Sequence, residues 1–64
     1  MCEATVYIVK GDGGQELVME DVDLVEFDQE DQVRLVSIFG DQISLRARVR
    51  SMSLAAHHIL LERA

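Results

Sequence analysis

The sequence has no proline, no tryptophan and a single cysteine, Cys2. One cysteine excludes a disulfide bond within the chain and suits a reducing compartment. No apolar run reaches the ~18 residues of a membrane-spanning helix, and no charged and then apolar leader precedes the first strand-like segment. We therefore expect a cytoplasmic protein with no membrane partner.

Basic residues are also scarce. The chain has 6 lysines and arginines against 12 aspartates and glutamates, which gives a net charge of −6. General nucleic-acid binding needs a surplus of cations to displace the counterions of phosphate, so this charge argues against it. The charge is uneven, because residues 1–31 hold ten acids and one base whereas residues 32–64 hold two acids and five arginines. One face or end of the molecule could therefore still be basic.

The length of the chain limits its hydrophobic core. A chain of 64 residues has room for one core, so we expect one domain over residues 1–64. Domains below about 70 to 80 residues usually need extra stabilisation from disulfides, a metal or oligomerisation. Because a disulfide within the chain is excluded, the sequence favours oligomerisation, a bound metal, or both.

The pattern that dominates the sequence is alternation with a period of two. Apolar and often β-branched residues alternate with polar ones over residues 4–10, 15–19, 22–28, 33–39, 43–54 and 58–62. This alternation predicts half-buried strands, and Gly11–Gly14 supplies the flexible turn of a hairpin. A phase shift between Leu24 and Val25 is typical of a β-bulge. We predict an all-β fold, namely a small antiparallel barrel of five to six strands with an SH3-like or Sm-like shape.

Two segments of this pattern carry further predictions. Glu20 and Asp21 are expected to form a polar corner that separates two short strands. Residues 53–61 include several good helix formers, so a short helix is an alternative to the last strand.

The strand expected over residues 33–39 predicts a subunit interface. If Val33, Leu35 and Phe39 face the core, then Val36 and Ile38 face outward. Two neighbouring β-branched residues exposed to water are unfavourable unless something covers them. A second copy of the chain is the simplest cover, so we expect a dimer interface at Val36 and Ile38.

Cys2 is the first candidate for chemistry. If processing removes Met1, the new terminus offers an α-amine and a thiolate that can chelate one metal ion; otherwise the Met1 amine and the Cys2 amide can supply nitrogen. A two-fold axis near the chain start would join two such pairs into an N2S2 set. That set suits planar Ni(II), whereas Cu(II) would compete on affinity and a tetrahedral arrangement would favour Zn(II). The residues alone do not choose among these ions, and a lone cysteine is often only a small residue near a terminus.

The arginines in the second half of the sequence indicate an alternative function. Arg46, Arg48 and Arg50 alternate along one expected strand, at a spacing of roughly 7 Å that could follow an RNA backbone or a protein partner. RNA-binding sheets usually add aromatic stacking platforms, and this chain has only three aromatic residues. Pairing of these arginines with the acidic strand 22–28, across the sheet or across a dimer, is the simpler explanation for them.

The remaining candidates favour structural roles. His57 and His58 are adjacent, so in a strand they would face opposite sides and could hardly reach one ion. Met19 and Met52 are interpreted as gap-filling core or rim residues. The serines have no recognisable base beside them, and the Gly11–Gly14 turn lacks the features of a phosphate loop. We therefore do not expect an enzyme.

Four features of the sequence are shared with one known family. They are the opening residues 1–7, Met-Cys-Glu-Ala-Thr-Val-Tyr, the Gly/Asp turn at 11–14, the acidic second and third strands and the overall length. In these features the chain resembles the CooT-type family of small nickel-binding proteins. The resemblance covers the whole chain, and its one sharp motif is Met-Cys at the start. It implies a homodimer of small β-barrels that binds one Ni(II) per dimer through the Cys2 of each subunit. It further implies a role like that of a nickel chaperone, in the maturation of carbon monoxide dehydrogenase. Members of this family are also often labelled predicted RNA-binding proteins.

Overall fold

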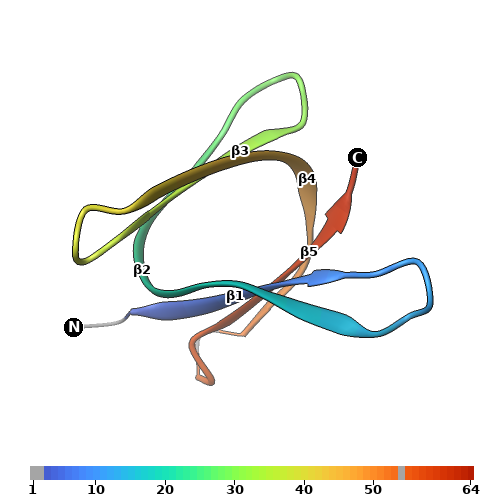
Figure 1. Cartoon of the computed structure of the whole chain (residues 1–64), viewed down its shortest axis with the longest axis horizontal. Coiled ribbons are helices and arrows are strands. Elements are labelled where there is room, and N and C mark those ends of the chain that lie inside the picture. The colour runs from blue at the N-terminus through green and yellow to red at the C-terminus, as the bar shows by residue number, and fades with distance from the viewer. Residues whose placement is uncertain (1–2, 54) are drawn as a thin grey trace.

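Five strands form a closed barrel in the computed structural model, which describes residues 3–53 and 55–64. The strands follow one another around the ring in chain order (Figure 1). They are β1 (Ala4–Val9), β2 (Gln15–Phe27), β3 (Gln32–Ser37), β4 (Gln42–Ser53) and β5 (His58–Arg63). The prediction of a small all-β barrel is confirmed.

The ring closes through its first and last strands. β1 pairs with β5 in parallel, with Thr5 opposite His58 and Ile8 opposite Leu61, whereas all other neighbours are antiparallel. This follows from the number of strands, because in a meander of five strands the first and the fifth run in the same direction. The expected antiparallel barrel therefore contains one parallel seam.

The second strand is longer than the sequence suggested. The expected corner at Glu20 and Asp21 is not a break between two strands, because β2 continues from Gln15 to Phe27. Asp21 takes a left-handed backbone conformation with φ of 57°, and irregularities in the pairing bend the strand there. The bulge predicted between Leu24 and Val25 lies slightly earlier, between Val22 and Leu24. Bulges of this kind bend one strand around a barrel corner and disrupt its pairing only locally.

The core fills the inside of the ring with residues from every strand. Leu35 and Leu61 are completely buried, and the β1 residues predicted to face inward, Val6 and Ile8, are buried as well. Ala4 packs against them at the edge. Met19 is also a core residue, as predicted. The full buried set is Val6, Ile8, Met19, Val22, Val33, Leu35, Ala47, Ile59 and Leu61.

The third strand ends earlier than predicted. Val33 and Leu35 are buried as expected, but β3 stops at Ser37, and the chain turns over residues 38–41. The buried Ser37 hydroxyl accepts hydrogen bonds from the backbone amides of Phe39 and Asp41, each at 3.2 Å. This turn overrides the alternation, so Phe39 is 74% exposed and not in the core.

The structure of the last two strands decides two further points of the prediction. The pairing of β4 with β5 is irregular between Val49 and Ser51, so the alternation expected along residues 43–54 is interrupted near Arg50. A turn at residues 55–57 leads into β5, and the alternative of a short helix over 53–61 is not adopted in the described part of that segment. Among the residues described, no helix exists that could span a membrane.

Candidate functional site

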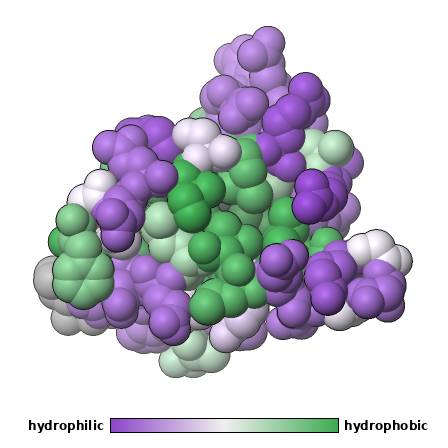
Figure 2. Space-filling model, in the orientation of Figure 1, coloured by the Kyte–Doolittle hydropathy of each residue, from purple (hydrophilic) through white to green (hydrophobic). Residues whose placement is uncertain are grey.

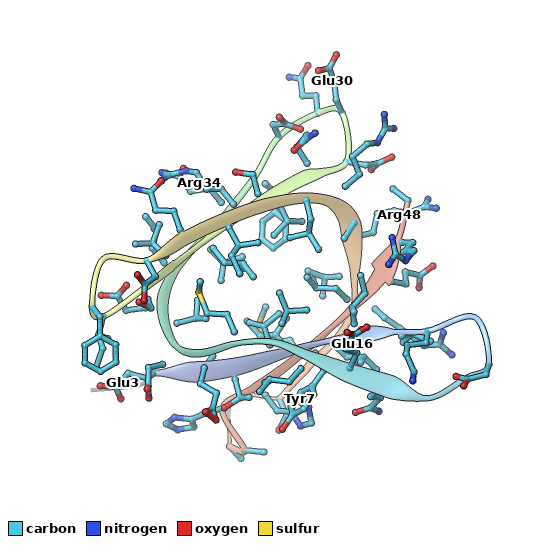
Figure 3. The ribbon with its side chains drawn as sticks, in the orientation of Figure 1. Glu3, Tyr7, Glu16, Glu30, Arg34 and Arg48 are labelled. Carbon is cyan, nitrogen blue, oxygen red and sulfur yellow. The ribbon has the colours of Figure 1, made fainter. Side chains whose placement is uncertain are left out.

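The predicted metal ligands Met1 and Cys2 lie outside the described residues, so the site is approached from the residue that follows them. Glu3 is the first described residue and stands directly before β1. Figure 3 shows Glu3 at the amino-terminal end of β1, on the same side of the molecule as the turn between β3 and β4. Two segments contact this end of β1, namely the bend of β2 and the β4–β5 turn.

The bend of β2 connects the start of the chain to the β3–β4 turn. Ala4 lies opposite Val22 in the pairing of β1 with β2, and Val22 lies opposite Ser37 in the pairing of β2 with β3. The Ile38 amide then donates a 2.8 Å hydrogen bond to the Asp21 carbonyl. The exposed turn after β3 is therefore held close to the start of β1.

Four apolar residues are concentrated on this turn and the strands beside it. Leu24 and Val36 are cross-strand partners on the outer face of β2 and β3. Leu24 is 41% exposed, Ile38 is 40% exposed and Phe39 is 74% exposed, while Val36 is half-buried. We call the set Leu24, Val36, Ile38 and Phe39 the amino-end patch. It contains the predicted interface residues Val36 and Ile38, and it adds Leu24 and Phe39, which sequence reasoning did not select because it assigned Phe39 to the core.

The turn between β4 and β5 is fixed to the chain start by two contacts. The Thr5 amide donates to the His57 carbonyl at 2.9 Å, and His57 Nδ1 lies 3.3 Å from the Glu3 carbonyl oxygen. His57 itself is exposed and takes a left-handed backbone conformation with φ of 53°. Its position beside Glu3 was not predicted, because 54 positions of sequence separate the two residues.

The neighbouring His58 has a different environment. Its ring packs at 58° against the Tyr7 ring, with 4.5 Å between the centroids, an arrangement typical of aromatic pairs. Its Nε2 atom is buried without a hydrogen-bond partner. Over residues 3–53 and 55–64, no group of three or more His, Cys, Asp or Glu side chains is placed to hold a metal ion.

A second apolar region lies at one end of the barrel. Figure 2 shows apolar side chains gathered in the middle of the face, within the ring of strands. A shallow groove at this end is lined by Phe27, Ala47 and Val49, with charged residues beside them. Phe27 is 53% exposed and Val49 is 38% exposed. We call this the mouth groove, and sequence reasoning did not predict it.

Within one chain, the arginines of β4 do not pair with the acidic strand across the sheet, and their pairing across a dimer stays a prediction. β4 lies between β3 and β5 and has no contact with β2 in the ring, so Arg48 faces Glu62 across the ladder. The ion pair between a basic residue and β2 is made by Arg34 of β3, which donates to the Glu26 carboxylate. Arg46, Arg48 and Arg50 are exposed. Figure 3 shows Arg48 on the opposite side of the molecule from Glu3, and RNA or partner binding by these three arginines stays a prediction.

Comparison with known proteins places the chain in a family. A family model described as CO dehydrogenase accessory protein CooT matches residues 1–62. The chain belongs to the CooT family. Its fold is similar to a crystal structure described as a CooT from Carboxydothermus hydrogenoformans, with 40% sequence identity, a TM-score of 0.86 and 98% of each chain covered. A comparison with curated proteins gave no match.

Membership in the CooT family confirms the resemblance found in the sequence and assigns an accessory role. Accessory proteins of CO dehydrogenase assist that enzyme and are not themselves enzymes. This agrees with the expectation that the chain has no catalytic activity of its own. The match of 98% of each chain at 40% identity also means that the described barrel is shared by this CooT and its neighbour.

Proposed function

We propose that this CooT is a homodimeric Ni(II)-binding protein, similar to a nickel chaperone, that serves the maturation of carbon monoxide dehydrogenase. Each subunit contributes the Cys2 thiolate and a nitrogen of the chain start to one Ni(II) per dimer. The nitrogen is the Cys2 α-amine if Met1 is removed, and the Met1 amine or the Cys2 amide if it is retained. The family's accessory role supports an enzyme client.

The choice of nickel in this proposal is based on the donor atoms. Thiolate and amine or amide nitrogen, doubled by symmetry, give four strong donors, which is the arrangement that planar Ni(II) takes up readily. Cu(II) binds the same donors more tightly by intrinsic affinity, so the supply of metal and the planar geometry decide between them. Binding displaces the thiol protons, and the affinity therefore rises with pH until the thiols are ionised.

The position of the amino-end patch is the single observation that supports a shared site most strongly. Ile38 and Phe39 lie on a turn that is hydrogen-bonded to the bend of β2, and that bend pairs with Ala4 at the start of β1. A two-fold axis through this patch would bring the starts of two chains together. Burial of Ile38 and Phe39 would contribute roughly 1.5 to 3 kcal/mol for each side chain.

Nickel titration of untagged protein tests the role of Cys2. We expect wild-type protein to show thiolate-to-nickel charge-transfer absorption that saturates at one Ni(II) per two chains. The Cys2→Ser variant keeps the size of the side chain and the processing of Met1, so it should lose this absorption without unfolding. Equal nickel affinity in the two proteins would contradict the proposal.

Two matched substitutions locate the dimer interface. Phe39→Ser removes the most exposed aromatic ring of the amino-end patch, whereas Phe27→Ser removes the exposed ring of the mouth groove. Sedimentation should show single chains for Phe39→Ser and dimers for Phe27→Ser. The reverse result would place the two-fold axis at the other end of the barrel and would separate the two Cys2 residues.

A further inference from the structure

The second half of β4 has one side that no other strand covers. β4 pairs with β3 as far as Arg46 and with β5 from Ala47 onward, so it changes partner partway along its length (Figure 1). In the described part of the chain, the side of residues 48–53 that faces away from β5 has no neighbouring strand. All of these residues are exposed. The ring is therefore closed in its strand order but leaves a free strand edge at residues 48–53.

The backbone groups of this edge are directed away from the barrel. Among the described residues, the last hydrogen bond on that side of β4 is donated by the Ala47 amide to the Asp31 carbonyl at 2.8 Å. The hydrogen-bonding groups of an antiparallel strand alternate between its two sides, so the Val49 amide and carbonyl point the same way as those of Ala47. A row of free N–H and C=O groups of this kind is a template for another strand.

The mouth groove lies directly beside this edge. Its lining combines Ala47, Arg48 and Val49 of β4 with Phe27 and the β2–β3 turn. It therefore occupies the place where a strand in line with β3 would continue along β4. Phe27 and Val49 expose apolar surface in it. A strand added to the edge would bury alternate side chains against these two residues while its backbone bonds to β4.

The charge of the edge indicates the chemistry of its partner. Residues 42–61 include three arginines and no acidic residue, in a chain whose net charge is −6. Two of the arginines, Arg48 and Arg50, belong to the free edge. Neither makes an ion pair with any residue that the structure describes. The edge is thus a basic region of an acidic protein, and it favours a partner with carboxylates.

The two acidic residues of the groove lie at its turn end. Asp28 and Asp31 both belong to the segment between β2 and β3. Asp28 Oδ1 accepts hydrogen bonds at 2.9 and 3.0 Å from two backbone amides that follow it, so this carboxylate stabilises its own turn. Carboxylates of a partner are therefore expected farther along β4, at Arg48 and Arg50.

The same charge makes a second copy of β4 a poor occupant of the edge. Two such edges set side by side would bring arginines together, and like charges on neighbouring strands are destabilising. Charged side chains on an edge strand commonly prevent self-pairing in this way. A strand of opposite charge meets no such repulsion.

We propose that the free edge of β4 and the mouth groove form a docking site for an extended acidic segment of a protein partner, which adds as a strand beside residues 48–53. Carboxylates of the segment pair with Arg48 and Arg50, and its apolar side chains cover Phe27 and Val49. Arg48 lies on the opposite side of the molecule from Glu3 (Figure 3). The docking site is therefore separate from the start of the chain and does not depend on the proposed metal site.

A peptide of about six residues that alternates glutamate and valine is a suitable probe. On titration, amide NMR should show shifts of Val49 and its neighbours in β4. Hydrogen exchange of the Val49 amide should slow, whereas that of the Arg48 amide, which points toward β5, should stay constant. The same peptide with N-methylated amides keeps its charge but cannot donate to a strand edge, so it should bind about tenfold more weakly or not at all.

A charge reversal tests the role of the arginines. Arg48→Glu should lower the affinity for the acidic peptide by about fivefold or more, because attraction becomes repulsion. Lys10→Glu is the matched control, since it changes the net charge equally at an exposed residue before the β1–β2 turn; it should bind as wild type. Cys2→Ser should also bind the peptide as wild type, so failure of the metal site and failure of the docking site are distinguishable.

Three results would overturn the proposal. The first is that the acidic peptide leaves the β4 amides unshifted, or binds equally well when N-methylated. The second is that a single-stranded oligouridine shifts these amides while the peptide does not, which would assign the edge to RNA. The third is that exchange of the Val49 amide slows with rising protein concentration alone, which would assign the edge to a second copy of the chain.

Discussion

At the scale of single residues, the two histidines show how adjacent positions acquire different chemistry. His57 stands in a turn, exposed and hydrogen-bonded to Glu3, while His58 opens β5 and packs on Tyr7. The sequence correctly indicated that the two rings would not share one environment. It could not indicate which ring lies at the start of the chain, because that contact joins residues 54 positions apart.

The buried nitrogen of His58 leads to a prediction about stability. A buried nitrogen without a partner costs roughly 1 to 3 kcal/mol, and His58 Nε2 is such an atom. His58→Phe keeps an aromatic ring beside Tyr7 and removes the unpaired nitrogen, next to a pocket lined in part by Gln15 and Met52. Urea denaturation should show a free energy of unfolding higher by about 1 kcal/mol. A lower value would mean that the nitrogen has a partner in solution.

At the scale of strands and turns, the sequence predicted which residues of a strand are buried better than where the strand begins and ends. The alternation of β1 placed Val6 and Ile8 in the core because the strand is short and regular. The same reasoning failed at Phe39, since a turn held by the Ser37 hydroxyl ended β3 two residues earlier. Polar residues at 20 and 21 suggested a break in β2, but a bend with continued pairing produces the same polar pattern.

The bend of β2 yields a prediction of its own. Asp21 has φ of 57°, a conformation that aspartate tolerates and that a β-branched side chain strongly resists. Asp21→Val should therefore lower the free energy of unfolding by at least ~1 kcal/mol, whereas Asp21→Gly should leave it unchanged or raise it. Thermal unfolding of the two variants gives this comparison. Equal effects of valine and glycine would show that the bend relaxes to an ordinary strand.

At the scale of the whole molecule, the order of strands around the ring decides which surfaces meet. The sequence indicated a small barrel of five to six strands, but it fixed neither the number of strands nor their order around the ring, on which the parallel seam between β1 and β5 and the separation of β4 from β2 depend. Those pairings depend on contacts between distant segments. For this reason the arginines expected to pair with acidic β2 lie elsewhere, and Arg34 makes that ion pair instead.

A dimer with a shared ion predicts that stability depends on concentration. Association and ligand binding stabilise the folded state by mass action, so the Tm should rise with protein concentration and rise again when Ni(II) is added. Calorimetry over a hundredfold range of concentration measures both effects. Phe39→Ser should lose the dependence on concentration, and a Tm of wild-type protein that is constant over this range would argue against a dimer.

The central claim is that two Cys2 thiolates, one from each copy of this CooT, hold a single nickel ion. Native mass spectrometry of the untagged protein, mixed with Ni(II), measures the chains and ions in each assembly directly. We predict a dominant species of two chains with one nickel ion for wild-type protein and nickel-free chains for Cys2→Ser. Nickel bound to single wild-type chains, or retained equally by Cys2→Ser, would contradict the account.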